Sequence, residues 1–315
     1  YAARFEEDDV KADGQDTVDE KVPNLFLAFT PPGKVTGTPI YINYGREQDF
    51  VELCSKSGDL CVLNEKGSDS FNLAFFPSLV CIMRYGKIFR ANKIFNAEKY
   101  GCKAAILYSD PIDVVIEDEP FYADGTSLPE SGGQRGTALA TSGDPETPGY
   151  PADPEMLFIR DTKRGDSLKP KIPAQVIPYR DAQVLLQNMN NAVDYVSENN
   201  PTEWKGNLPD VSYHTGPGFN NPNYKIYVES NNYQEYKEIN TVCGFLYGSE
   251  ERDRYVIFGN HRDAWAYGAI DPNSATASMM EVVKAFGNLL KNDGYRPKRS
   301  LMFCSLAAEE YGLIG

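Results

Sequence analysis

The sequence predicts an α/β protein with two domains, and three observations support this prediction. The 315 residues are 41% hydrophobic, which is enough to bury at least one core, and the length itself suggests two domains. Short apolar runs of strand length alternate with segments whose apolar residues recur at helical spacing. A stretch rich in Pro, Gly, Asp and Ser, at about 111–170, interrupts this alternation as a long irregular loop.

The first part of the chain reads as an acidic lead-in followed by strand, helix and strand. Residues 1–22 are polar and acidic, and strand-like runs follow at 39–45, 79–86 and 103–110. Between the last two runs, ANKIFNAEKYG places apolar residues at helical spacing and ends on a glycine, which predicts a helix. Beyond the irregular loop, IPAQVIPYRDAQVLLQNM predicts a short strand and a helix that starts near Asp181.

The second part, from about 237, predicts a parallel strand-helix-strand unit. TVCGFLYG and RYVIFGN read as strands, and 274–292 carry one apolar stripe that predicts a helix ending at Asp293-Gly294. SLMFCSLA is almost wholly apolar, as expected of a strand covered on both faces. Residues 254–307 are therefore predicted to form a right-handed parallel βαβ unit.

Charge and hydropathy argue against a nucleic-acid partner and against a membrane-spanning segment. The net charge is −14 and no block of Lys or Arg is present, so a nucleic-acid partner is not expected. No apolar run reaches 18 residues, so no membrane-spanning segment is expected within these residues. The acidic opening and the abrupt end at AAEEYGLIG lead us to expect a piece of a longer protein.

The six cysteines divide into two groups. Cys54 and Cys61 flank a short loop and could form a local disulfide in an oxidising compartment. The other four lie in or beside apolar runs and are predicted to be buried thiols: Cys81, Cys102, Cys243 and Cys304.

Ionisable side chains follow both strands of the predicted βαβ unit. His261, Asp263 and Asp271 come after the first strand, and Glu309 and Glu310 come after the second. Because the carboxyl ends of parallel strands share one sheet edge, we expect these groups to meet. Imidazole and carboxylates suit zinc, Asp263 is placed to accept the other ring N–H of the histidine, and a carboxylate that is not a ligand can act as general base.

Each part of this cluster has an ordinary explanation when taken alone. A lone histidine at a strand end is more often structural than a ligand, and an adjacent glutamate pair is usually a solvated turn. The joint pattern, with ionisable residues at two strand ends and correct βαβ spacing, favours a metal site.

Several motifs resemble one known family. HRDAWAYGAIDPNSATASMMEVVKAFG and RPKRSLMFCSLAAEEYGLIG resemble the co-catalytic zinc peptidases of the glutamate carboxypeptidase II and transferrin receptor family. RYGKIFRANKIFNAEKYGCKAAILYSDP, QRG…GDPETPGYPA and IPAQVIPYRDAQVLL resemble its protease-associated (apical) domain, in the same order. The resemblance covers about 25–315. It implies an apical domain at 23–236 and, at 237–315, the first part of a peptidase domain with a mixed, largely parallel sheet flanked by helices.

The resemblance also implies a site with two zinc ions. His261 would bind one zinc, Asp271 would bridge both, and Glu310 would bind the second. Glu309 would be the general base that activates water. The two remaining ligands of the family, an Asp and a His, would lie beyond Gly315.

Residues for the substrate and for calcium follow from the same resemblance. Phe89 and Arg90 match the residues that receive the C-terminal residue of a small peptide, and an arginine can clamp a carboxylate in a bidentate way. Without the resemblance, Arg90 reads as a surface arginine before a helix. Gly312 and Leu313 match residues of the substrate pocket. Thr147 and Tyr150 match residues whose backbone carbonyls bind a structural calcium ion. A homodimer formed through an absent helical domain, and an extracellular location on a type II membrane protein, are also implied.

One departure from the family pattern leaves alternatives open. The glutamate-selective members carry an Asn between QRG and GDP, whereas the loop here, TALATS, is two residues shorter and has none. We expect a carboxypeptidase or dipeptidase that releases a C-terminal, acidic residue. An aminopeptidase relative is the alternative, as is a receptor-like relative without metals, although this sequence keeps His261, Asp271 and both glutamates.

Overall fold

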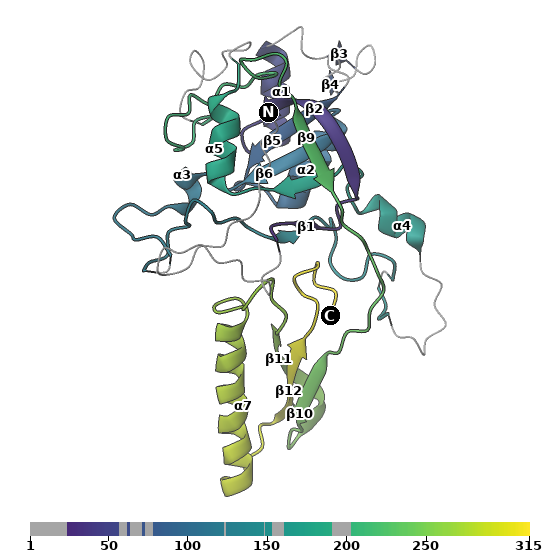
Figure 1. Ribbon diagram of the computed structural model, residues 1–315. Coiled ribbons are helices and arrows are strands. Elements are labelled where there is room, and N and C mark those ends of the chain that lie inside the picture. Colours follow the sequence, from purple (N-terminus) through teal and green to yellow (C-terminus); the bar gives the residue numbers. More distant parts are fainter. Residues whose placement is uncertain are drawn as a thin grey trace. The chain divides into compact units, whose positions relative to one another are not determined.

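A computed structural model describes residues 24–56, 62–63, 71–72, 78–122, 124–147, 149–152, 161–190 and 203–315 (Figure 1). The described chain forms two compact units. The first contains Asn24–Ala140 and Asp166–Gln234, and the second contains Thr141–Gly165 and Glu235–Gly315. The expected boundary at 236 lies close to the last crossing between units, at 234–235, but 141–165 group with the second unit and not with the rest of 23–236. The lead-in at 1–22 lies outside the described residues.

A five-stranded sheet forms the centre of the first unit. Its strands are β2 (Gly33–Tyr41), β5 (Leu79–Arg84), β6 (Ala104–Tyr108), β8 (Ala174–Val176) and β9 (Ile226–Ser230). The order is β8-β6-β5-β2-β9, with every neighbouring pair parallel except β2 and β9. β5 and β6 are buried along their whole length, which is why both read as uninterrupted apolar runs.

Helices and short strand pairs complete the first unit. The helices are α1 (Glu47–Lys56), α2 (Arg90–Lys99), α3 (Pro111–Val114) and α5 (Tyr179–Gln187). A further helix, α4 (Thr162–Ser167), spans a boundary between the two units, because 162–165 belong to the second unit and 166–167 to the first. The short strands are β1 (Leu27–Ala28) with β7 (Gly136–Thr137), and β3 (Val62–Leu63) with β4 (Phe71–Asn72). The expected strands and both expected helices are confirmed. β9 was not expected, and the region expected to be irregular contains α3, β7 and α4.

The second unit carries the predicted strand-helix-strand arrangement. Its sheet has the order β10 (Val242–Leu246), β12 (Arg299–Leu306), β11 (Glu251–His261), and α7 (Asn273–Asp293) joins β11 to β12. β11 and β12 are parallel, and β10 runs antiparallel to β12. The parallel pairing predicted within 254–307 is therefore confirmed.

Packing explains why the apolar stripe of α7 was visible in the sequence. Three of its residues, Met279, Phe286 and Leu290, pack against a small core of Leu246, Leu301 and Phe303 on the sheet. The helix ends where Gly294 takes a left-handed conformation, with φ 63°, which glycine adopts without steric cost. Among the helices of the described residues, none combines the length and the apolar character needed to cross a bilayer.

The prediction of four buried thiols is wrong, because these cysteines form two disulfides. Cys243 and Cys304 are direct partners in the register of β10 and β12, with their Cα atoms 4.2 Å apart. Cys81 of β5 bonds to Cys102, which precedes β6. Strand pairing brings each pair together across 61 and 21 residues, a proximity that apolar flanking sequence does not reveal. Cys54 is disulfide-bonded too, and its expected partner lies outside the described residues.

Candidate metal centre

The ionisable residues singled out in the sequence meet at one edge of the sheet in the second unit. His261 is the last residue of β11, and its partner in the register is Leu306, the last residue of β12. The Nε2 atom of His261 lies 2.9 Å from Oδ1 of Asp271 and 3.9 Å from Oε2 of Glu309. One ligand atom each from His261, Glu309 and Glu310 fit within 4.8 Å of one another. The expected proximity of these side chains is therefore confirmed.

A backbone carbonyl group orients the ring of His261. Its Nδ1 atom lies 2.9 Å from the backbone carbonyl oxygen of Asp263, whereas the Asp263 carboxylate is 3.6 Å away. A hydrogen bond from Nδ1–H to this carbonyl leaves Nε2 as the atom that faces Asp271. The sequence analysis gave this role to the carboxylate of Asp263, and the structure gives it to the carbonyl.

The carboxylate of Asp263 instead joins the two halves of the cluster. Its oxygens accept hydrogen bonds from the backbone amides of Glu309 and Glu310, at 3.0 and 3.1 Å. Because Asp263 lies two residues after His261, these bonds hold the glutamate turn at a set distance from the histidine. A carboxylate that accepts two amide N–H groups forms charge-assisted bonds, which are stronger than neutral ones.

Two polar residues that sequence reasoning missed anchor the end of β11 to α7. Asn260 donates to the carbonyl of His261 and to Oγ1 of Thr276, both at 2.6 Å. Thr276 in turn donates to the same carbonyl at 3.1 Å. The only signal in the sequence was a polar residue beside the histidine and another in the first turns of α7.

Crowded negative charge is the main electrostatic feature of the cluster. Burial raises the pKa of Glu310, and the negative charges of Asp271 and Glu309 raise it further. Burial lowers the pKa of His261, but the charge of Glu309 and the contacts with Asp263 and Asp271 outweigh burial, so the net pKa is raised. The carboxylates around this imidazole repel one another, and a bound cation would relieve that repulsion. This donor set, with one nitrogen and several oxygens, fits zinc.

The predicted substrate residues Phe89 and Arg90 belong to the first unit, at the start of α2. Phe89 is 46% exposed, and the guanidinium carbon of Arg90 lies 5.1 Å from its ring centroid. Arg90 makes a long hydrogen bond of 3.4 Å to the Thr137 carbonyl, and its buried Nε has no partner among the described residues. A Cβ atom at Gly136 would stand 2.4 Å from Cζ of Arg90, so the glycine makes room for the guanidinium.

The remaining predicted residues lie in turns of the second unit. The amides of Gly312 and Leu313 both donate to the Glu309 carbonyl, so they close the turn that carries the glutamate pair. The Gly312 carbonyl accepts from the amide of Gly143. Thr147 is buried, and its carbonyl accepts a long bond of 3.4 Å from the amide of Tyr150. The structure thus places the predicted calcium residues in one turn.

Comparisons with known proteins show which families the chain is similar to. Residues 241–315 match the model of peptidase family M28. The chain is 36% identical over 311 residues to aminopeptidase NAALADL1 of Rattus norvegicus, covering 95% of the chain and 38% of that protein. It is 35% identical over 296 residues to a glutamate carboxypeptidase 2 homolog of Caenorhabditis briggsae, covering 92% of the chain and 36% of the relative.

A more distant relative and a solved structure complete the comparison. Transferrin receptor protein 2 of Homo sapiens is 31% identical over 293 residues, covering 93% of the chain and 32% of the receptor. A zinc aminopeptidase from Bacillus subtilis is similar with a TM-score of 0.38 and 15% identity, over 97% of the chain and 49% of that structure. The chain spans little more than a third of the length of the curated relatives that it matches.

Proposed function

Because residues 241–315 match the model of peptidase family M28, we propose that the protein carrying this chain is a zinc-dependent peptidase that hydrolyses small peptides, with Glu309 as general base. The observation that supports this proposal most strongly is the meeting of His261, Asp271, Glu309 and Glu310 at one sheet edge. No single strand supplies all of these groups, and the fold brings them together beyond the ends of β11 and β12.

Each residue of the cluster has a role in this proposal. His261, Asp271 and Glu310 would hold zinc. Zinc, when bound, supplies Lewis-acid polarisation of the scissile carbonyl and lowers the pKa of water. Glu309 takes the proton from the attacking water and delivers it to the leaving amine. Asp263 keeps the glutamate turn at its distance from the histidine through the two amide bonds.

Removal of metal is the experiment that tests this function. We expect purified protein stripped of metal with a chelator to lose at least about 100-fold in peptide hydrolysis, since both the Lewis acid and the activated water disappear. Added zinc should restore the rate, whereas magnesium, which prefers an all-oxygen octahedral shell, should not. The control is a parallel sample treated with chelator already saturated with zinc. Full activity in metal-free protein would exclude the proposal.

For the substrate, we propose a peptide whose free C-terminal carboxylate binds Arg90. A carboxylate that enters a protein site needs a fixed partner for its charge, and a guanidinium fork supplies two charge-assisted bonds. The single long bond of Nη1 leaves the end of the Arg90 guanidinium with donor capacity for such a ligand.

Replacing Arg90 by Ala should weaken binding of free-acid dipeptides by roughly 100-fold, the scale on which one partner of a buried charge pair is lost. Amidated peptides should already be poor substrates of the unaltered protein. The measurement is KM for a panel of dipeptides that differ at the C-terminal residue, each as acid and as amide. Lys99→Ala, at the opposite end of the same helix, removes a half-exposed cation and serves as the control.

An aminopeptidase is the second candidate, and two observations favour it. The rat relative carries that name, and the TALATS loop lacks the asparagine of glutamate-selective members. In that case the free amine of the substrate is recognised, acids and amides are cleaved equally, and Arg90→Ala has no effect on their ratio. A receptor-like role without metals receives less support, because His261, Asp271 and both glutamates are kept.

The disulfides bear on location. Disulfides that join structural elements persist in oxidising compartments. Cys243–Cys304 joins two neighbouring strands, and Cys81–Cys102 joins β5 to the residues before β6. They support the proposal that this part of the protein is extracellular. A calcium ion held by the carbonyls of Thr147 and Tyr150 is a further proposal that rests on the family resemblance.

A further inference from the structure

We propose that Arg262 is a positioning residue of the metal centre: its guanidinium ties the ends of β11, β12 and the segment entering β10 to one another. It thereby holds His261 and the glutamate pair at the separation that zinc requires. This inference rests on the proposed function, since it concerns the same site. Arg262 itself does not belong to the group of candidate ligands, and its side chain is exposed.

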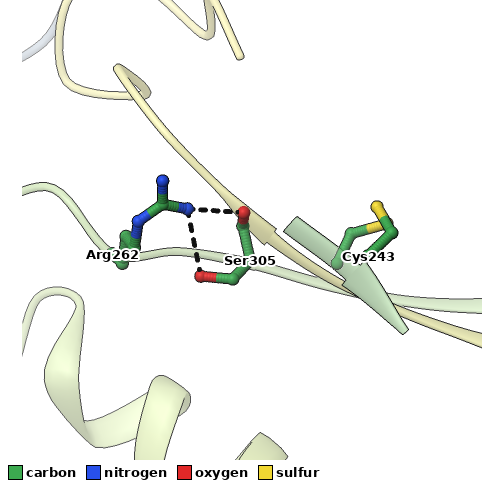
Figure 2. The surroundings of a disulfide bond; sticks show 4 residues. Cys243, Arg262 and Ser305 are labelled. Atoms are coloured by element: carbon green, nitrogen blue, oxygen red, sulfur yellow. Dashed lines mark hydrogen bonds between the residues drawn. A yellow bond between two sulfur atoms is a disulfide. The ribbon is translucent and has the colours of Figure 1, made fainter. Parts of the chain in front are cut away.

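The contacts of Arg262 reach two other segments of the second unit. Its Nη1 donates to the backbone carbonyl of Ser305 at 2.7 Å and lies 3.3 Å from the Ser305 hydroxyl oxygen (Figure 2). Its Nη2 donates to the carbonyl of Asn240, two residues before β10 begins. The backbone amide of Arg262 donates to the carbonyl of Leu306 at 3.0 Å. One residue therefore bonds three carbonyls on two neighbouring segments.

These bonds act where the regular sheet ends. The register of β11 and β12 stops at the pair His261 and Leu306, so strand pairing does not extend to the loops that carry the other candidate ligands. Arg262 is the first residue beyond that pair, and it bonds back to Ser305 and Leu306 at the end of β12. The carboxylate of Asp263 accepts from the turn that follows β12. Arg262 fixes the end of β12, and Asp263 fixes the turn that follows it.

A disulfide cross-links the same end of β12 to β10, the neighbour on the side away from β11. Cys304, the residue before Ser305, is bonded to Cys243 of β10 (Figure 2). β10 and β12 are thus joined covalently at the position next to the one that Arg262 contacts. The guanidinium also bonds Asn240, which lies just before β10. Arg262 therefore connects the end of β11 both to β12 and to the segment that enters β10. A planar fork with fixed donors suits this role, and a lysine ammonium on a flexible stem does not reproduce it.

The test compares Arg262→Gln with Arg254→Gln in the purified protein. Arg254 is also an exposed arginine of the same segment, but it lies near the opposite end of β11 and pairs with Glu251. Loss of a residue that orients a metal ligand without binding the metal itself typically lowers metal affinity by about 10- to 100-fold. We expect Arg262→Gln to weaken zinc binding by about 10-fold, measured by competition with a chromophoric chelator, and Arg254→Gln to leave it unchanged. Arg262→Lys should fall between the two.

Two further readouts separate positioning from general stability. With zinc in excess, Arg262→Gln should lower kcat and leave KM unchanged, since the substrate contacts are intact. In the metal-free protein, amide exchange at 305–310 should speed up in Arg262→Gln and not in Arg254→Gln. Equal zinc affinities and equal exchange for the two variants would overturn the proposal. If the unaltered protein binds no zinc, the proposed function fails instead, and the exchange experiment still decides the role of Arg262.

Discussion

Replacing Glu309 by Ala is expected to lower the turnover number by at least about 100-fold while zinc stays bound. A general base contributes on this scale, because without it the attacking water keeps its proton as it meets the carbonyl. The side chain is well placed to act as this base, since Oε2 lies 3.9 Å from Nε2 of His261, beside the candidate ligands, and the backbone amide is held by Asp263. Glu309→Gln should behave in the same way, since an amide has the shape of the carboxylate without its basicity.

Turnover and zinc content must be measured on the same preparations of these variants. Glu281→Gln is the matched control, because Glu281 is an exposed carboxylate of α7 whose partner is Lys284 three residues on. That variant should keep both zinc and turnover. A loss of zinc from the Glu309 variants as large as their loss of activity would show that Glu309 is a ligand and not the base.

Replacing Glu310 by Ala is expected to empty the site. Glu310 offers a candidate ligand atom to the cluster, and burial and neighbouring negative charge raise its pKa, so a bound cation would stabilise its charged form. Loss of a direct ligand should weaken zinc binding by more than the roughly 10- to 100-fold typical of outer residues. His261→Ala should have the same effect, since it removes the nitrogen donor.

Equilibrium dialysis against buffered zinc gives the affinity of each variant. The contrast between neighbours is the informative part: Glu310→Ala should lose zinc, and Glu309→Ala should keep it. Equal loss from both variants would mean that the two glutamates share the ligand role, and the proposed division of roles would then be wrong.

Much of this arrangement was predictable because the hydrophobic patterns of strands and helices are local signals in the sequence. Buried parallel strands such as β5 and β12 appear as apolar runs, and α7 as a single stripe. The rule that parallel strands end at one edge then placed His261 near Glu309 without knowledge of any contact. β9 was not predicted from the sequence. Only alternate residues of this short strand are buried, and the exposed Tyr227 and Glu229 made it resemble the polar residues around it.

What could not be predicted depends on pairing between distant segments. The link between Cys243 and Cys304 exists only once β10 lies antiparallel to β12. The carboxylate of Asp263 was assigned to the neighbouring histidine on grounds of sequence distance, yet it accepts from amides 46 and 47 residues away. The sequence analysis did not single out Arg262, although it lies between two candidate site residues. Its bonds to main-chain carbonyls leave no trace in residue type.

Anomalous diffraction at the zinc edge, from crystals of the complete protein, tests the central claim most directly. The account predicts a zinc peak beyond the ends of β11 and β12, within about 2.0–2.2 Å of a ring nitrogen of His261 and of carboxylate oxygens of Asp271 and Glu310. Glu309 should stand outside this shell, with its carboxylate directed at the open position. A zinc peak elsewhere in the protein, or one bound by Glu309 with Glu310 turned away, would contradict the account.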